Sequence, residues 1–472
     1  MAPTFFTFLP LLVPLLSSVA LSQEIAPRVV YANDFIDPDF ILAGNFGPYT
    51  QRAQASIISW AEASALDGPW SVMNKTIEPP SGDRHDYLSW APYTWPNCTG
   101  IPNADKLTPQ QIWTTCPYIT KDGQFNPDRL LVNDTGHFGA MAETVLYNTI
   151  AWTLNTTQKE TYESTAVRFL RTWFLDPETA MNPNLNYAQM IRGPNSTIGA
   201  HTGVLDLKCM AKVASAVLML RKGGSKAWTS DLDSKMISWS AKQANWLETA
   251  DIALQERATG NNHGTYYFNQ LASLKLITND VKGALNTTNA YFNGIYMNQI
   301  VAGGEQPEEA SRTHPYHYRN YNLAAMFVNA RISAYASGSK DIYSKPTKQG
   351  ATIHDAVNLA MAQSPAKTDE ENYLPEMYPN VASAASIYGD ADGKYLAFMK
   401  STFGPDYISQ PFILWNAPFA SGEASGQISS TASTGASKPT TSNHVSSAFS
   451  PSTDSMNTFL VTLSVFLLSY LF

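Results

Sequence analysis

The chain has 472 residues, which is enough for two or three domains or for one large domain with appended segments. Its 31 basic and 39 acidic residues give a net charge of −8, so it lacks the positive field that binds nucleic acid phosphates, and we exclude nucleic acid as a partner. Hydrophobic residues make up 44% and charged residues only 15%, which excludes wholesale disorder and favours an extracellular protein that handles a hydroxyl-rich ligand such as a sugar.

The chain begins with an apolar, uncharged run at residues 5–20 (FFTFLPLLVPLLSSVA). This run is too short to span a bilayer comfortably, and Pro10 and Pro14 interrupt it. The pattern predicts a secretory signal peptide over residues 1–22, with a short membrane anchor as the alternative.

An aromatic loop follows at residues 82–96 (GDRHDYLSWAPYTWP), where prolines disfavour a regular helix. Exposed rings present flat faces on which sugars can stack, so we expect this loop to bind a carbohydrate. The alternative is that the rings attach the loop to the core. The candidate binding residues of the loop are His85, Trp90, Tyr93 and Trp95.

The chain has three cysteines, and two of them, Cys98 and Cys116, flank a polar segment that contains proline. A disulfide between them would stabilise the fold by about 3 kcal/mol in an oxidising compartment. Cys209 lies in an apolar, alanine-rich stretch and is expected to be an unreactive buried thiol. Secretion also agrees with the N-x-[ST] sequons at Asn74, Asn97, Asn133, Asn155, Asn195 and Asn286.

Helical periodicity dominates the middle of the chain, and alternating, strand-like runs are scarce. Apolar residues form one helical stripe within residues 138–152 and another within residues 207–220. Further helices are predicted within residues 230–256, 266–277 and 321–336. Because no long Pro/Gly/Ser-rich linker divides residues 23–420, we expect one large all-α domain of paired helices with its function on the loops.

A second candidate loop covers residues 173–194 (WFLDPETAMNPNLNYAQMIRGP). Its dense neutral amides suit the recognition of sugar hydroxyl groups, and the alternative is that they satisfy their own backbone in turns. The candidate binding residues of this loop are Tyr187, Gln189 and Arg192.

The third candidate region is split between residues 261–267 (NNHGTYY) and 312–319 (RTHPYHYR). In an extended segment, Arg312 and Tyr318 are six residues apart and would project to the same side. A guanidinium beside a phenol favours the phenolate, so we expect a lowered pKa for Tyr318. Alone, His263 is as readily a core histidine, and it is the combination that indicates catalysis. The candidate catalytic residues are Asn262, His263, Arg312 and Tyr318, and Tyr316 and Arg319 are candidate binding residues.

Other chemistries fit the sequence less well. His314 and His317 have a spacing that suits a metal, but no third ligand is evident, and we expect no metal and no other cofactor. A carboxylate pair for glycoside hydrolysis would have to come from acidic residues that nothing in the sequence pairs, namely Asp83, Asp86, Asp134 and Glu143.

The C-terminal end has a composition of its own. Residues 421–450 are dominated by Ser, Thr, Ala and Gly, which predicts a disordered stalk. An uncharged apolar tail at residues 459–472 is shorter than the ~20 residues of a spanning helix. With the small residues before it, the tail resembles a GPI-attachment propeptide at residues 451–472, which predicts a protein held by lipid on the outer leaflet of the plasma membrane. Ser446 is the expected attachment residue, Asn443 competes with it, and a tail-type membrane helix is the alternative.

Several segments resemble the alginate-lyase-domain family, whose members are polyuronate lyases with an α/α toroid (an incomplete helical barrel) related to chondroitin AC lyase. They are SWAPYTWP (89–96), FLDPETAMNPNLNYAQ (174–189), NNHGTYY (261–267) and the segment from Arg312 to Tyr318. The spacings of 49 residues from His263 to Arg312 and six from Arg312 to Tyr318 are closer to the branch with glucuronan and alginate lyases. The resemblance implies an α/α-toroid lyase domain over residues 23–420.

The resemblance also implies roles for single residues. Asn262 and His263 resemble the pair that binds the C6 carboxylate of a uronate, and Tyr318 with Arg312 resembles the catalytic tyrosine and its neighbouring arginine. Neutralising the carboxylate makes H5 acidic. In β-D-glucuronate and β-D-mannuronate, H5 and the departing O4 lie on the same side of the ring, so Tyr318 can serve as both base and acid. In α-L-guluronate they lie on opposite sides, and His263 is the candidate second base.

The sequence therefore predicts a secreted, monomeric polysaccharide lyase that cleaves an acidic polysaccharide, glucuronan or mannuronate-rich alginate, by β-elimination. One alternative is a surface protein of the same fold that binds carbohydrate without cleaving it. The other alternative is an inverting glycoside hydrolase, which would release saturated sugars.

Overall fold

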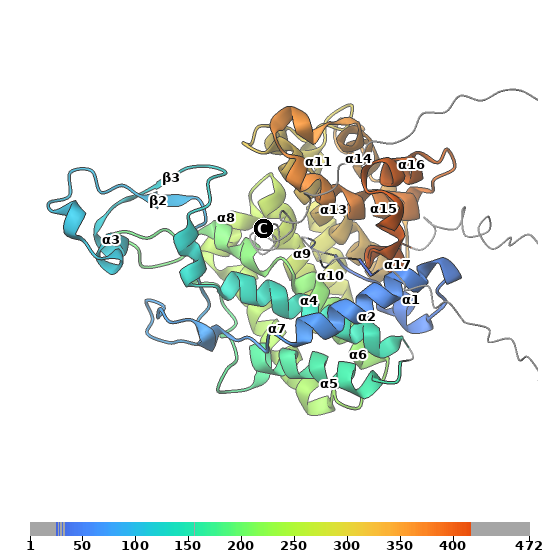
Figure 1. Ribbon diagram of the computed structural model, residues 1–472, viewed down its shortest axis with the longest axis horizontal. Helices are drawn as coiled ribbons and strands as arrows, with labels where there is room; N and C mark the ends of the chain where they lie inside the picture. Colours follow the sequence, from blue (N-terminus) through green and yellow to red (C-terminus); the bar gives the residue numbers. More distant parts are fainter. Residues whose placement is uncertain (1–24, 27, 29–30, 32–33, 155, 417–472) are drawn as a thin grey trace, which may run out of the picture.

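The computed structural model describes residues 25–416 except residues 27, 29–30, 32–33 and 155. The predicted signal peptide, stalk and GPI propeptide, including Ser446, lie outside the described residues. Helices dominate the described part of the chain, and strands are few there (Figure 1). Among these helices we find none that combines the length and the hydrophobicity needed to cross a membrane.

The inner layer of the fold is a series of helices that are buried around most of their circumference. Consecutive members of this series contact one another, so they follow each other around the centre of the molecule. Buried helices of this kind carry few charged residues, and most of the polar side chains that they bury are neutral, such as Asn269, Gln270 and Asn329. The inner helices are α4 (Asp134–Thr153), α6 (Met210–Lys222), α9 (Asn262–Ile277), α13 (Pro315–Ser337) and α15 (Met377–Tyr388).

The outer layer consists of helices that bury one face against the inner layer. In α5, for example, Tyr162, Ala166 and Phe169 are buried at helical spacing, whereas Thr161, Ser164 and Arg168 are exposed. α2 and α5 pack on α4, α7 packs on α9, α10 on α9 and α13, and α14 on α13 and α15. The outer helices are α2 (Gln51–Ala65), α5 (Lys159–Leu170), α7 (Ser230–Thr249), α10 (Val281–Asn293) and α14 (Ile353–Ala362).

The two ends of this double layer are joined by short terminal segments. Asp34, near the N-terminal end, accepts hydrogen bonds from Arg331 at 2.9 Å and from the Trp415 indole at 2.7 Å. α17 (Phe412–Trp415) contacts both α2 and α15. The predicted all-α toroid in one large domain is confirmed by this arrangement. The remaining short helices are α1 (Pro38–Ala43), α3 (Pro109–Thr115), α8 (Asp251–Arg257), α11 (Tyr296–Gln299), α12 (Pro307–Ala310) and α16 (Lys394–Thr402).

An arm, residues 91–126, extends from the helical body (Figure 1, left). Inside it β2 (Thr94–Pro96) pairs antiparallel with β3 (Tyr118–Thr120), and Cys98 and Cys116 form a disulfide. At its base β1 (Leu88–Trp90) pairs parallel with β4 (Tyr187–Met190). The sequence predicts loops for these segments, because strands of three or four residues are too short to show an alternating pattern.

The predicted helical stretches correspond to α4, α6, α7 with α8, α9 and α13. The stretch at 230–256 is divided, because α7 ends at Thr249 and Ala250 adopts an extended conformation. α13 begins at Pro315, earlier than the predicted residue 321. Proline suits the first turn of a helix, where its missing N–H would have no partner.

Candidate active site

A cavity of about 390 Å³ lies between the arm and the inner helices. Both α9 and α13 begin at this cavity, so Asn262, His263 and Tyr318 reach it from the first turns of two helices. The first N–H groups of both helices are already bonded, to Glu309 and Asn261 in α9 and to Glu370 in α13. The cavity is also lined by three cationic side chains, Arg129, Lys208 and Arg312. The cavity is therefore suited to an anionic ligand.

The phenol of Tyr318 is held by two neighbours. Its oxygen accepts a hydrogen bond from Arg312 Nη2 at 2.9 Å and lies 2.9 Å from the hydroxyl of Tyr93, on the arm. The Arg312 guanidinium also lies 3.9 Å above the centre of the Tyr318 ring. The expected contact between the two residues exists, but not through an extended segment. Tyr318 is helical, and the loop before Pro315 folds Arg312 back over it.

The expectation that Arg312 keeps the pKa of Tyr318 low is wrong for the free protein. Burial and the neighbouring Tyr93 raise the pKa of Tyr318 above its usual value of 10.0, and the positive charge of Arg312 offsets only part of this effect. The phenol is therefore protonated at neutral pH and can donate a proton before it accepts one.

Arg312 is fixed in turn by the arm. Asp122 accepts a hydrogen bond from Arg312 Nη2 at 2.9 Å and another from the Thr313 hydroxyl at 3.2 Å. Burial opposes ionisation of this carboxyl, but the bonds from Arg312 and Thr313 outweigh burial and lower the pKa of Asp122. The arm thus supplies both Tyr93 and Asp122 to the surroundings of Tyr318. Asp122 is not among the residues predicted for the site, because nothing local in the sequence relates it to residue 312.

Asn262 is oriented by a buried carboxyl group. Glu309 of α12 accepts a hydrogen bond from the Asn262 backbone N–H at 2.6 Å and one from Asn262 Nδ2 at 2.8 Å. Burial raises the pKa of Glu309, and the bonds from Asn262 oppose that rise. The second Nδ2 hydrogen remains for a ligand. Within the described residues, Asn262 Oδ1 has no hydrogen-bond partner.

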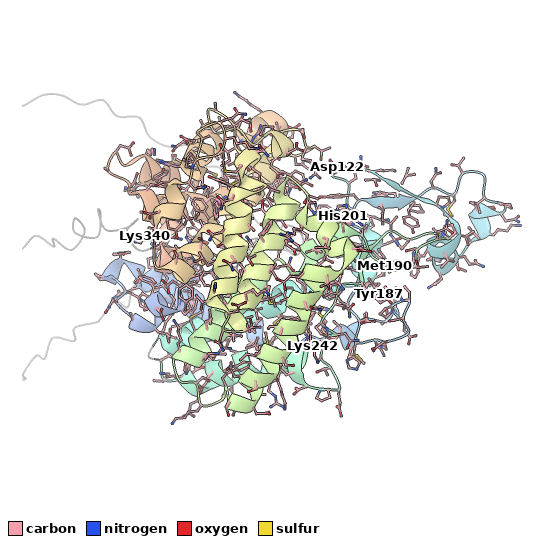
Figure 2. The ribbon with its side chains drawn as sticks, turned by 180° about the vertical axis from the view of Figure 1, so that it is seen from behind. Asp122, Tyr187, Met190, His201, Lys242 and Lys340 are labelled. Carbon is pink, nitrogen blue, oxygen red and sulfur yellow. A yellow bond between two sulfur atoms is a disulfide. The ribbon has the colours of Figure 1, made fainter. Side chains whose placement is uncertain are left out.

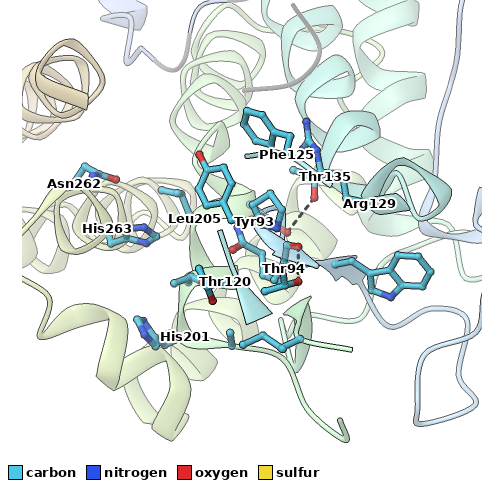
Figure 3. Close-up of a pocket in the computed structure, with 18 of the residues that line it drawn as sticks. Tyr93, Thr94, Thr120, Phe125, Arg129, Thr135, His201, Leu205, Asn262 and His263 are labelled. Atoms are coloured by element: carbon cyan, nitrogen blue, oxygen red, sulfur yellow. Dashed lines mark hydrogen bonds between the residues drawn. The ribbon is translucent and has the colours of Figure 1, made fainter. Parts of the chain in front are cut away.

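Glu256 links two histidines at the cavity wall. Its Oε1 lies 2.6 Å from Nδ1 of His263, and its Oε2 lies 2.6 Å from Nδ1 of His201. Burial opposes ionisation, but the two imidazoles outweigh it and lower the pKa of Glu256, while the hydrogen bond to Glu256 raises the pKa of His201. An ionised Glu256 holds a proton on each Nδ1, which leaves each Nε2 for a ligand. Figure 3 shows His201 and His263 on one side of the cavity, opposite Tyr93, Phe125 and Arg129.

Gln189 lies at the cavity in a constrained conformation. Its φ of 46° is in the left-handed region, which is uncommon for a residue other than glycine. Its backbone N–H donates to Ser89 Oγ at 2.7 Å, and its Nε2 donates to Asp206 Oδ1 at 2.8 Å. Asp206 also accepts hydrogen bonds from the hydroxyls of Tyr87, Ser89 and Thr135. The network offsets the backbone strain and presents the Gln189 amide to the cavity.

Several predicted binding residues line the cavity, and others lie outside it. Trp90, Tyr93 and Gln189 line it together with the four candidate catalytic residues. On α13, Tyr316 precedes Tyr318 by two residues and Arg319 directly follows it. Each residue turns the helix by about 100°, so neither side chain points into the cavity as Tyr318 does. The predicted binding residues outside the lining are His85, Trp95, Tyr187, Arg192, Tyr316 and Arg319. Arg319 pairs with Glu305, Tyr316 is buried in the core, and Tyr187 lies in β4. The Trp95 indole donates to the carbonyl of Gln124, and His85 Nδ1 bonds the carbonyl of Ala180.

Arg192 has a structural position instead of a place in the cavity. Its guanidinium is stacked between Trp90, at 4.1 Å, and Tyr118, at 4.6 Å, and its Nη1 donates to Asp128 at 3.0 Å. This stack ties the base of the arm to β1. Figure 2 shows Asp122, His201 and Met190 in the region where the arm meets the body.

The residues considered for other chemistries do not form a second centre. Within the described residues, no three His, Cys, Asp or Glu side chains come close enough together to hold a metal ion. His317 Nδ1 lies 2.7 Å from Glu376. The acidic residues considered for hydrolysis do not line the cavity. Asp83 and Asp86 accept hydrogen bonds from Asn182, Asp134 pairs with Lys75, and Glu143 pairs with Lys212.

The comparisons with known proteins identify the class of this helical toroid as the polysaccharide lyases. The model of the family described as "Alginate lyase" matches residues 71–372, and the chain belongs to this family. An alginate lyase from Bacteroides ovatus superposes with a TM-score of 0.70 at 26% identity, over 82% of this chain and 100% of that chain. Alginate lyase A1-III from Sphingomonas species A1 gives a TM-score of 0.44 at 14% identity, over 79% and 92% of the two chains. No curated protein matches the sequence significantly.

Proposed function

We propose that this polysaccharide lyase cleaves a polyuronate, either glucuronan or mannuronate-rich alginate, by β-elimination. One observation carries the proposal. The Tyr318 hydroxyl is held 2.9 Å from Arg312 in the same cavity that Asn262 and His263 line. The similarity to an alginate lyase from Bacteroides ovatus supports a polyuronate as the substrate.

The first task of the site is to stabilise charge on the uronate carboxyl group. Removal of H5 pushes electron density into this carboxylate. Asn262, which donates to Glu309 through Nδ2, and His263, whose Nδ1 lies beside Glu256, line the cavity together with Arg312 and supply polar and positive groups for this charge. These groups are in place before the substrate binds, so little reorganisation accompanies the reaction.

The second task is proton transfer. For a β-linked uronate, the Tyr318 phenolate removes H5, the C5–H electrons form the C4=C5 double bond, and the C4–O4 bond breaks. The new phenol then gives the same proton to the departing glycosidic oxygen. Because burial raises the pKa of Tyr318, the phenol must first lose its own proton, and the hydrogen bond from Arg312 stabilises the resulting anion.

One feature favours α-L-guluronate as a second substrate. Glu256 holds the proton of His263 on Nδ1, which leaves Nε2 as an acceptor on the cavity side. In this anti elimination, His263 removes H5 from one face of the sugar, and the neutral Tyr318 phenol donates its proton to O4 on the other. This route uses the phenol in the protonation state of the free protein.

The test measures the ultraviolet absorbance of the C4–C5 double bond during incubation with glucuronan, polymannuronate, polyguluronate or chondroitin. We expect absorbance to grow with at least one uronate homopolymer and to be abolished by Tyr318→Phe. Tyr118→Phe is the matched control, because within the described residues the Tyr118 hydroxyl has no hydrogen-bond partner. Saturated products, or product formation that survives Tyr318→Phe, would contradict the proposal.

We further propose that the protein is a secreted monomer, GPI-anchored at the cell surface. The proposal rests on the sequence at both ends of the chain and on the Cys98–Cys116 disulfide, which suits an oxidising compartment. Release of the protein from intact cells by a phosphatidylinositol-specific phospholipase, abolished when residues 451–472 are removed, would support it. Retention in the cytosol would contradict it.

A further inference from the structure

One wall of the cavity continues well beyond the candidate catalytic residues. This wall is η6 (His201–Leu207), which begins at His201, beside Glu256 and His263. Lys208 directly follows η6 and also lines the cavity. At ~2 Å per residue of a 3₁₀ helix, about 14 Å of backbone separates Lys208 from His201. The two ends of this wall therefore face different parts of a bound polymer.

Lys208 is a largely buried lysine whose ammonium group has no hydrogen-bond or ion-pair partner among the described residues. Only 8% of the residue is exposed, and among the described residues no carboxylate or other acceptor pairs with its ammonium group. Asp206, two residues earlier, is occupied by Gln189 and by the hydroxyls that surround it. A buried charge is costly unless an opposite charge and hydrogen bonds compensate for it.

The other buried lysines of the described chain are paired. Lys75 lies 3.2 Å from Asp134, and Lys212 lies 3.2 Å from Glu143. These lysines are 3% and 2% exposed, and both stabilise the interior away from the cavity. Lys208 alone among them lines a cavity, so the missing anion is expected from a ligand.

We propose that Lys208 binds the carboxylate of a second uronate, located along the polysaccharide from the sugar that is cleaved. This inference rests on the proposed function, because it takes the ligand to be a polyuronate. Each 1,4-linked uronate carries one carboxylate, so a bound oligomer brings a second negative charge into the cavity at a fixed spacing from the first. Burial strengthens the resulting ion pair. Lys208 then favours the binding of longer, charged oligomers, whereas Tyr318 acts on one sugar.

The experiment measures binding without turnover. Tyr318→Phe is titrated calorimetrically with oligomannuronates from disaccharide to hexasaccharide, alone and combined with Lys208→Met, Lys208→Arg or Lys242→Met. Lys242 is an exposed residue of α7 and serves as the control (Figure 2). We expect Lys208→Met to weaken hexasaccharide binding roughly 10- to 100-fold and to leave the disaccharide nearly unchanged, as for loss of a hydrogen bond to a charged group. Lys208→Arg and Lys242→Met should retain binding.

A thermal melt separates binding from a structural role. Because Lys208 has no partner in the part of the chain that the structure describes, Lys208→Met should keep or raise the Tm, whereas Lys212→Met should lower it by leaving Glu143 buried and unpaired. Hexasaccharide affinity unchanged within about twofold, or equal losses for disaccharide and hexasaccharide, would overturn the inference. The proposed function fails separately, if the wild type forms no unsaturated product. Failure of Tyr318→Phe to bind any oligouronate would overturn both.

Discussion

The hydroxyl groups of Tyr93 and Tyr318 lie 2.9 Å apart, although 225 residues separate them in the chain. Tyr93 belongs to the arm and Tyr318 to the first turn of α13. The arm therefore forms part of the surroundings of the proposed catalytic oxygen. Tyr93 also raises the pKa of Tyr318 beyond the effect of burial.

The raised pKa of Tyr318 predicts an alkaline activity profile on polymannuronate. In the proposed syn elimination the phenolate is the active base, and at any pH below its pKa the fraction of phenolate increases tenfold with each pH unit. We expect kcat/KM to rise by about tenfold per unit from about pH 7 to about pH 9. Initial rates of absorbance growth across this range provide the measurement. A flat profile, or a fall above neutral pH, would contradict Tyr318 as the base.

On polyguluronate, the same pKa predicts a different profile. Here the neutral phenol is the acid that protonates O4, and raising the pH does not increase its amount. We therefore expect no alkaline rise for this substrate. Parallel pH profiles on the two polymers would argue against the two proton-transfer routes.

Replacing Tyr93 should shift the alkaline rise of kcat/KM on polymannuronate to lower pH. In Tyr93→Phe, one contribution that raises the pKa of Tyr318 is lost, so the rise of kcat/KM on polymannuronate should occur at lower pH. The pH–rate profile of Tyr118→Phe, an arm residue away from the cavity, should match the wild type. An unchanged profile for Tyr93→Phe would show that burial alone sets the pKa.

Glu256→Gln should damage both catalysis and pH-dependent stability. Without the carboxylate, neither His263 nor His201 is held in the tautomer that presents Nε2 to the cavity, and we expect a loss of roughly 10- to 100-fold in kcat/KM. Polyguluronate should be affected most. Wild-type activity in Glu256→Gln would exclude a positioning role for the carboxylate.

The stability effect follows from two pKa shifts of opposite sign. The lowered pKa of Glu256 contributes stability above about pH 4.3, its value in an unfolded chain, and this contribution is lost as the pH falls through the lower folded value. The raised pKa of His201 contributes below about pH 6.5 and is lost as the pH rises through the higher folded value. Melting temperatures should therefore differ most between wild type and Glu256→Gln from about pH 4.3 to 6.5.

Removal of the disulfide should loosen the arm. Cys98 and Cys116 are 18 residues apart, and a loop of this size is worth about 3 kcal/mol in the chain-entropy model. In the double Ser variant we expect a lower free energy of unfolding in urea and a lower kcat/KM, because Tyr93 and Asp122 both lie on the arm. Stability and kcat/KM equal to those of the wild type would show that the β2–β3 pairing alone holds the arm in place.

The spacing of apolar residues along the sequence is enough to predict the buried helices, because side chains that pack against neighbouring helices recur at helical intervals. It is also enough to gather Asn262, His263, Arg312 and Tyr318 as one site. It is not enough for His201, Glu256, Glu309 and Asp122, because each acts through a partner brought close only by the fold.

The same limit explains why several predicted binding residues lie outside the cavity: the local sequence does not show where the fold places each side chain. Arg192 and Gln189 are three residues apart in one polar loop, and their composition does not distinguish them. The fold stacks Arg192 between two rings and turns Gln189 toward the cavity. The predicted direction of the Tyr318 pKa shift is wrong because a sequence shows the neighbouring charge but not the depth of burial, which here has the larger effect.

The left-handed backbone at Gln189 limits what natural variation can place there. Asparagine adopts the left-handed conformation more readily and keeps an amide group. Its side chain is shorter, so in a homologue with asparagine the amide would extend less far into the cavity. Valine or isoleucine would force the peptide into a β conformation and displace Met190 from its pairing with Trp90. A single branched side chain at this position would thus alter the shape of the cavity wall while leaving Tyr318, Arg312 and His263 unchanged.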